Sequence, residues 1–99
     1  LTRHGYQILC RNFRCRQGEI DIIARDRDYL VFIEVKYRRD EHEGDPAEAV
    51  DARKKARILR TARYYMTRYH ISEDTPCRFD VVAVLGSNVR LIRDAFWCG

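Results

Sequence analysis

The chain has 99 residues, enough for a single domain, 1–99, with one sheet and one or two helices. Lys and Arg outnumber Asp and Glu by 19 to 15, and this modest excess favours a nucleic-acid partner without requiring one. No apolar stretch is long enough to cross a membrane and no signal peptide is visible, so we expect a cytoplasmic protein. The four cysteines form no CxxC pair and fit no common zinc module, which favours reduced thiols.

The apolar pattern predicts five strands and one helix. The expected elements, in chain order, are strands at 6–14, 19–24 and 29–36, a helix at 45–69, and strands at 78–85 and 89–93. The helix has a strong start, because Asp45 can act as its N-cap and Pro46 stands at the first helical position. The order β-β-β-α-β-β indicates an α/β fold in which a helix packs on a mixed β-sheet.

Periodicity predicts which side chains share a face. In the third strand, one face carries Val31, Ile33 and Val35, and the other carries Leu30, Phe32, Glu34 and Lys36. Alternation along the second strand places Ile20 and Ile22 together on one face. The helix repeats apolar residues every three or four positions, at Ala52, Ala56, Leu59, Ala62, Met66 and Tyr69. On another face of the helix, Arg53, Arg57 and Arg60 form a basic stripe that could bind nucleic-acid phosphates. An ordinary solvated helix face explains this stripe equally well.

Two of the predicted strands carry charges where buried strands should carry none. Asp21, Glu34 and Lys36 lie within runs of Ile, Val and Phe. Buried charges are costly unless they are paired or bind a metal, so a compensating cation is expected. A two-residue loop at 27–28 would place Asp21 directly opposite Glu34, whereas a three-residue loop would pair Asp21 with Ile33.

These charged residues suit the hydrolysis of a phosphodiester. Mg²⁺ and Mn²⁺ bind carboxylate oxygens, which Asp21 and Glu34 could supply from neighbouring strands, with the backbone carbonyl of Val35 as a third ligand. A divalent metal activates water and neutralises charge on the phosphate. Lys36 shares a strand face with Glu34, so its ammonium could orient the water or stabilise the developing negative charge.

Four short segments resemble a known family. They are GYxILxRN at 5–12, GEIDIIA at 18–24, FIEVKxR at 32–38 and RFDVV at 78–82. In this order they resemble the UPF0102 family of small bacterial proteins, which is similar to the archaeal Holliday-junction resolvases. The resemblance implies a restriction-endonuclease-like fold with a PD-(D/E)xK site, and hence a metal-dependent endonuclease that acts on structured DNA.

The resemblance also implies a role for individual residues. Asp21 matches the metal-binding aspartate of the motif, Glu34 its second acid and Lys36 its lysine. The family usually has a helix with a further glutamate before the first strand, and the chain, beginning at Leu1, is expected to lack both. Loss of that helix would expose apolar sheet surface and favour a homodimer. Tyr37 stands where a small polar or basic residue is more usual.

Several neighbouring residues have two interpretations. Glu19 could assist the metal or form a salt bridge with Arg14 or Arg16. Asp80 is expected to be structural and to bond to Arg78 or to a backbone amide. The residues expected to contact the DNA backbone beside the site are Arg38 and Arg39.

The whole site also has a simpler explanation. Asp21 and Glu34 could form ordinary ion pairs with Lys36 or a nearby arginine on a solvated sheet face. The fold would then be a nucleic-acid-binding module that does not cut, or a protein-interaction domain whose sheet docks a partner. The sequence contains no base-reading element, so any DNA specificity is expected to be for shape.

Overall fold

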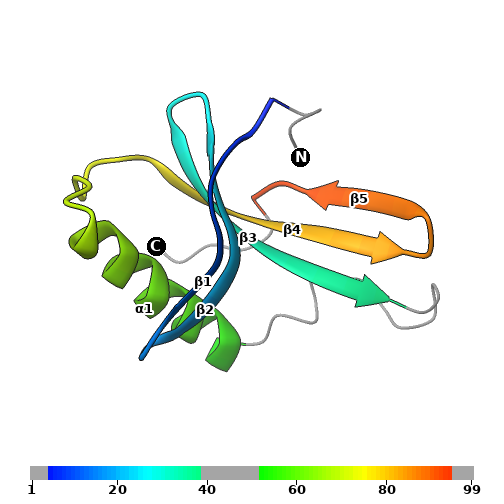
Figure 1. The fold of residues 1–99 in the computed structure, drawn as a ribbon, viewed down its shortest axis with the longest axis horizontal. Coiled ribbons are helices and arrows are strands. Elements are labelled where there is room, and N and C mark those ends of the chain that lie inside the picture. Colours follow the sequence, from blue (N-terminus) through cyan, green and yellow to red (C-terminus); the bar gives the residue numbers. More distant parts are fainter. Residues whose placement is uncertain (1–4, 39–51, 95–99) are drawn as a thin grey trace.

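The computed structural model describes residues 5–38 and 52–94, which form one sheet with a helix on one face (Figure 1). Its elements are β1 (Gln7–Cys15), β2 (Gly18–Asp26), β3 (Tyr29–Arg38), α1 (Ala52–Arg68), β4 (Cys77–Leu85) and β5 (Asn88–Ile92). This order confirms the predicted β-β-β-α-β-β arrangement. The predicted N-cap and first turn of the helix lie outside the described residues.

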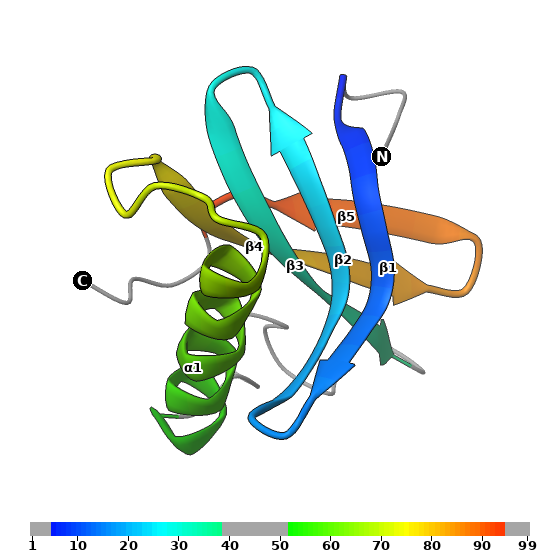
Figure 2. The same ribbon diagram turned by 60° about the vertical axis from the view of Figure 1, so that its left-hand side comes forward.

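The five strands follow one another in the sheet in chain order, β1-β2-β3-β4-β5. All neighbours are antiparallel except β3 and β4, so the sheet is mixed, as predicted. A parallel pair needs a long connection between its strands, and here that connection contains α1. The sheet is strongly twisted, with β1 and β2 running at a steep angle to β4 and β5 (Figure 2). Within the described residues, α1 is the one helix, and it is neither long nor apolar enough to cross a membrane.

Apolar side chains fill both faces of the sheet. On the helix side, Phe32 stacks on Phe79 with ring centroids 5.4 Å apart and meets Tyr65 of α1 edge-on at 6.2 Å. On the opposite face, Val31 and Ile33 belong to a second buried cluster. The alternation predicted for β3 is therefore confirmed. Each fully buried side chain of this size contributes about 1.5–3 kcal/mol relative to leaving it in water.

The buried face of α1 differs from the predicted one. The structure buries Ile58, Thr61, Ala62 and Tyr65, which follow the i, i+3, i+4, i+7 spacing of a helix face. The predicted positions Ala52, Ala56 and Tyr69 are exposed, and Leu59 and Met66 are only partly buried. The prediction was therefore only partly correct. It included the buried Ala62, and Leu59 and Met66, which pack against the core, but it left out Ile58, Thr61 and Tyr65. The Thr61 hydroxyl donates to the Arg57 carbonyl oxygen at 2.8 Å, so it is satisfied within the helix and can enter the core.

The alternation of β2 is interrupted near its middle. Ile20 and Ile23 both belong to the helix-side cluster, whereas Ile22 packs on the opposite face, so the predicted pairing of Ile20 with Ile22 was wrong. Opposite this point in β1, Asn12 has a left-handed backbone with φ of 54°. The β1–β2 register itself shifts farther along the pair, between Ile8 and Cys10. The interrupted segment of β2 contains Asp21.

A buried polar network joins the strands on the face opposite the helix. Asp80 is 0% exposed and accepts hydrogen bonds from the Tyr6 hydroxyl at 2.6 Å and from Arg78 Nε at 3.0 Å. The backbone N–H of Asp94 donates to the same carboxylate at 2.9 Å. Arg78 also reaches Asp26 at 2.9 Å. The structural role predicted for Asp80 is therefore confirmed, and burial together with its hydrogen bond raises the pKa of Tyr6.

Three of the cysteines lie in the described strands. Cys10, Cys15 and Cys77 form no disulfide among the described residues, and Cys98 lies outside them. Burial raises the pKa of the Cys77 thiol. A protonated, partly buried thiol of this kind behaves as a small apolar side chain.

The turn between β1 and β2 packs closely against α1. Gly18 has φ of +147°, and a Cβ atom there would lie 2.8 Å from Arg57 Cγ and 2.9 Å from Thr61 Oγ1. Gly18→Ala is therefore expected to lower the free energy of unfolding by about 2–4 kcal/mol, through backbone strain and overpacking together. Urea denaturation measures this change.

Gly86 provides a matched control. Its φ is +58°, but a Cβ atom there would meet nothing within 4 Å. Gly86→Ala should cost only the left-handed backbone strain, about 1–2 kcal/mol. Equal losses in the two variants would show that the hairpin is not closely packed on the helix.

Candidate active site

The β2–β3 hairpin brings the two predicted acids together. Its loop is the two residues 27–28, which is the first of the two predicted alternatives. The paired register continues to Ile22 opposite Ile33, so the next positions are Asp21 and Glu34. Beyond this point β3 leaves β2 but stays paired with β4 to its end. The acids therefore lie where two strands of the sheet separate.

At this separation the Asp21 side chain accepts a hydrogen bond from β3 that a backbone carbonyl of β2 would otherwise accept. Its Oδ2 accepts a hydrogen bond of 2.7 Å from the backbone N–H of Val35. Since the N–H and C=O of one strand residue point to the same edge, the Val35 carbonyl faces the same side as Asp21. Burial raises the pKa of Asp21, the Val35 N–H opposes this, and the nearby carboxylates of Glu34 and Glu19 raise it further.

Glu34 lies between two ammonium groups. Its Oε1 is 3.2 Å from Lys36 Nζ on the same strand and 2.7 Å from Lys54 Nζ on α1. Only 14% of the Glu34 side chain is exposed, against 19% for Lys36 and 33% for Lys54. Burial and the neighbouring Lys54 lower the pKa of Lys36. Burial alone would lower the pKa of Lys54, but its contact with Glu34 outweighs this and raises it.

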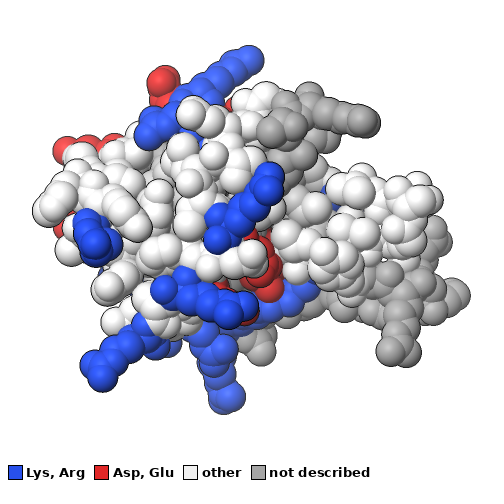
Figure 3. Space-filling model, viewed as in Figure 1, with Lys and Arg blue, Asp and Glu red and all other residues white. Residues whose placement is uncertain are grey.

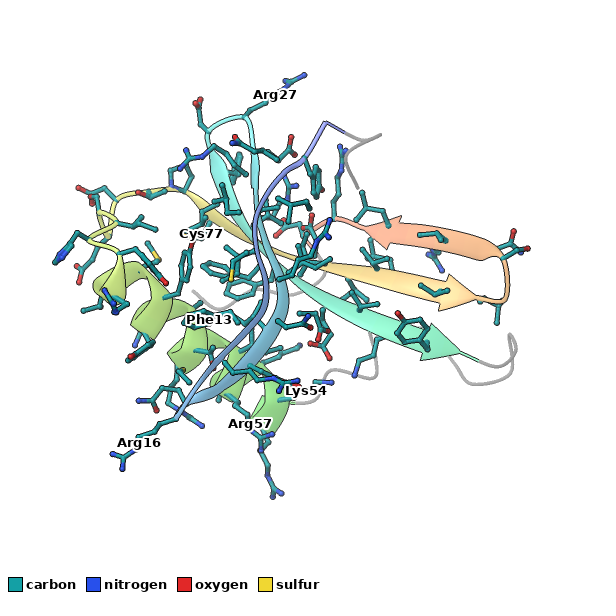
Figure 4. The ribbon with its side chains drawn as sticks, in the orientation of Figure 1. Phe13, Arg16, Arg27, Lys54, Arg57 and Cys77 are labelled. Carbon is teal, nitrogen blue, oxygen red and sulfur yellow. The ribbon has the colours of Figure 1, made fainter. Side chains whose placement is uncertain are left out.

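A cavity of about 510 Å³ opens beside these residues, between the β1–β2 hairpin and the first turns of α1. Its lining contains both signs of charge, and comprises Arg14, Cys15, Gly18, Glu19, Asp21, Glu34, Lys54, Arg57 and Ile58. Figure 3 shows acidic side chains as a small group on this face with Lys and Arg side chains around them. Lys54 and Arg57 extend from the start of α1 beside the hairpin, and Arg16 lies at its tip (Figure 4).

The other predicted residues are placed as follows. Glu19 forms a salt bridge of 2.9 Å with Arg14, one of its two predicted interpretations, although both residues line the cavity. The predicted stripe of Arg53, Arg57 and Arg60 is exposed on α1, but only Arg57 of the three lines the cavity. Arg38 ends β3, and Arg39 lies outside the described residues.

Sequence reasoning did not include Lys54 and Arg14 in the site. Lys54 precedes the buried Ile58 by four residues, so it extends from the helix face that turns toward the sheet. A correct prediction of the buried face of α1 would have placed Lys54 beside the sheet.

The residues that could hold a hard divalent cation are Asp21 and Glu34, with the Val35 carbonyl as a further oxygen. Mg²⁺ commonly binds one or two carboxylates and keeps several waters. Among residues 5–38 and 52–94, no three His, Cys, Asp or Glu side chains are grouped to hold a metal ion. A cation at this point would therefore depend on water, the Val35 carbonyl and a bound phosphate for its remaining ligands.

Comparisons with known proteins identify the family. A family model described as "Uncharacterised protein family UPF0102" matches residues 1–84. The chain belongs to this family. A UPF0102 protein of Lachnoclostridium phytofermentans is 55% identical over 96 residues, which cover 97% of this chain and 81% of that protein. One from Symbiobacterium thermophilum is 50% identical over 101 residues, with 97% and 85% covered, and one from Nitrosococcus oceani is 42% identical over 100 residues, with 97% and 81% covered.

The resemblance to UPF0102 stated from the four segments is thus confirmed. The part of this chain matched by the UPF0102 model contains the whole candidate site, including Asp21, Glu34, Lys36 and Lys54.

Proposed function

We propose that this UPF0102 chain is a metal-dependent endonuclease that acts on structured DNA. We further propose that its fold is restriction-endonuclease-like, with a PD-(D/E)xK site similar to that of the archaeal Holliday-junction resolvases. One observation gives the main support for this function. Asp21 and Glu34 meet where β2 and β3 separate, and Lys36 contacts Glu34 from the same strand.

The proposed cofactor is Mg²⁺ or Mn²⁺, held by Asp21, Glu34 and the Val35 carbonyl. When bound, the cation polarises the phosphate and lowers the pKa of a water molecule. Burial is the main cause of the raised pKa of Asp21, and the nearby carboxylates of Glu34 and Glu19 raise it further. A cation bound beside these acids would offset both effects, which supports the proposal.

Lys36 is the proposed positioning group for the attacking water. Its ammonium is held 3.2 Å from Glu34 on a rigid strand, and burial keeps it out of bulk solvent. In hydrolysis the water oxygen forms a bond to phosphorus, the bond to the leaving oxygen breaks, and that oxygen takes a proton. A fixed positive charge beside the phosphate stabilises the negative charge that develops in this step.

Basic residues around the cavity are proposed to bind the DNA backbone. Arg57 lines the cavity, and Arg53 and Arg60 lie exposed on the same helix. Arg38 and Arg39 follow Lys36 in the chain and are proposed to make further backbone contacts. Because such contacts read charge and shape, the proposed preference is for a branched structure over a particular sequence.

Arg57→Gln is expected to weaken DNA binding and to reduce its salt dependence. A lost phosphate contact should lower the slope of log K against log salt by about one unit. Gln keeps the Cγ and Cδ atoms that pack on the β1–β2 turn, so the fold should be retained.

Arg63→Gln is the control, because Arg63 lines a different cavity, between α1 and β4. Equal slopes in both variants would remove Arg57 from the DNA interface. Fluorescence anisotropy of a labelled four-way junction at several salt concentrations gives both slopes.

A second candidate function is a DNA-binding module that does not cut. The two ammonium groups at 2.7 and 3.2 Å from Glu34 favour it, since they satisfy this carboxylate without a metal. The two functions predict different results when a carboxylate is removed. Cleavage is lost in the first, whereas there is no cleavage to lose in the second.

The test is cleavage of a labelled four-way junction and a linear duplex of the same sequence, with Mg²⁺ or Mn²⁺. We expect metal-dependent cleavage of the junction, lost in Glu34→Gln with binding retained. Tight junction binding without cleavage at any metal concentration would select the non-cutting module.

A further inference from the structure

Lys54 makes the shortest ion pair of the candidate site. Its Nζ lies 2.7 Å from Glu34 Oε1, closer than the Lys36 Nζ at 3.2 Å. It comes from α1, whereas both acids and Lys36 come from strands. We infer that Lys54 occupies the position of the divalent cation at Glu34 in the metal-free protein, and that its ammonium passes to the substrate phosphate when the cation binds. This inference rests on the proposed function.

The charges explain why one ammonium must leave. Asp21 and Glu34 together carry two negative charges, which Lys36 and Lys54 balance. A divalent cation bound to Glu34 would lie within a few ångströms of both ammonium groups, and like charges at such distances repel strongly in a partly buried site. The site can therefore accept the cation at full strength only if one lysine withdraws.

Lys54 is better suited to withdraw than Lys36. It is the more exposed of the two, at 33% against 19%. Its ammonium is carried on a flexible four-carbon stem from the rim of the cavity, while Lys36 lies within a paired part of β3. Withdrawal of Lys54 breaks no backbone pairing.

The cavity gives the released ammonium a destination. Lys54 lines it together with Arg14 and Arg57, and the carboxylates of Glu19, Asp21 and Glu34 line it too. With a divalent cation bound at the acids, a phosphate entering the cavity would meet positive charge from the cation, the hairpin and the helix. Lys54 would donate to a phosphate oxygen in the presence of the cation and to Glu34 in its absence. Lys54 is thus a positioning residue that couples cation binding to phosphate binding.

The first measurement is the affinity for Mn²⁺ in the absence of DNA, determined by electron paramagnetic resonance or calorimetry. Lys54→Met removes the competing ammonium and should bind Mn²⁺ roughly three- to tenfold more tightly than the natural protein. Arg63→Met is the matched control. It removes the same charge from an exposed position of α1 that lines a different cavity, and its Mn²⁺ affinity should change by less than about twofold because exposed charges are screened.

A second measurement follows junction binding with Ca²⁺, which fills an oxygen site. Lys54→Met should bind the junction roughly three- to tenfold more weakly under these conditions, since one charge-assisted contact to phosphate is lost. Tighter Mn²⁺ binding together with weaker junction binding in Lys54→Met is the result expected if Lys54 exchanges Glu34 for the phosphate when the cation binds. A purely structural lysine would move neither affinity in this way.

Glu34→Gln separates the possible outcomes. If the natural protein binds Mn²⁺ and Glu34→Gln does not, the metal site is present, and an unchanged or weaker Mn²⁺ affinity in Lys54→Met then overturns the exchange alone. Mn²⁺ binding that appears only in Lys54→Met supports the exchange directly. Absence of Mn²⁺ binding in every variant, Lys54→Met included, overturns both the exchange and the proposed metal site.

Discussion

Asp80→Ala is expected to lower the free energy of unfolding by about 3–5 kcal/mol, the range typical of breaking a buried ion pair from one side. Asp80 is fully buried and accepts hydrogen bonds from Tyr6 and Arg78. The Arg78 guanidinium is only 13% exposed, and without Asp80 its positive charge would be paired with Asp26 alone. Because a domain of this size is stable by only about 5–15 kcal/mol, much of its stability would be lost. Urea denaturation followed by far-UV circular dichroism measures the effect.

Glu19→Ala is the control for removal of a carboxylate from a salt bridge. Its partner Arg14 is 75% exposed and Glu19 is 59% exposed, so solvent screens the pair and little stability should be lost. Similar midpoints for Asp80→Ala and Glu19→Ala would contradict the structural role of the buried network.

Asp21→Asn is expected to reduce metal-dependent cleavage by about a hundredfold or more, since it removes a charged ligand of the proposed cation. The fold should survive, because the Asn side-chain oxygen can still accept the hydrogen bond that Val35 now donates to Asp21. Asp21→Ala would lose that acceptor too and is the less informative variant. Single-turnover cleavage of the junction measures the rate.

Asp28→Asn is the matched control for this charge change, because Asp28 is an exposed residue of the β2–β3 loop. Its cleavage rate and junction affinity should be those of the natural protein. Cleavage by Asp21→Asn at the rate of Asp28→Asn would remove Asp21 from the catalytic site.

The sequence predicts most of the sheet because its signals there are local. A two-residue loop fixes the register of the β2–β3 hairpin, and this register alone is enough to place Asp21 next to Glu34. The alternation of β3 predicts its two faces correctly for the same reason. The connection through a helix then implies a parallel partner for β3.

Tertiary packing decides what the sequence did not predict. The buried face of α1 includes Thr61, whose hydroxyl is satisfied within the helix, and it extends to Ile58 and Tyr65, so the predicted face was only partly correct. The break in β2 lies opposite Asn12, whose left-handed backbone in the facing strand no pattern within β2 records. Both errors hid site geometry. The observed helix rotation brings Lys54 to Glu34, and the break in β2 falls on the segment that contains Asp21.

The most direct test of the metal site is the position of Mn²⁺ in crystals of the protein, from its anomalous scattering. The proposal predicts a peak in contact with the carboxylates of Asp21 and Glu34 and with the Val35 carbonyl, and Lys54 withdrawn from Glu34. Mn²⁺ bound elsewhere, with Lys36 and Lys54 both still on Glu34, would contradict the proposal and leave these residues as an ordinary ion-pair cluster.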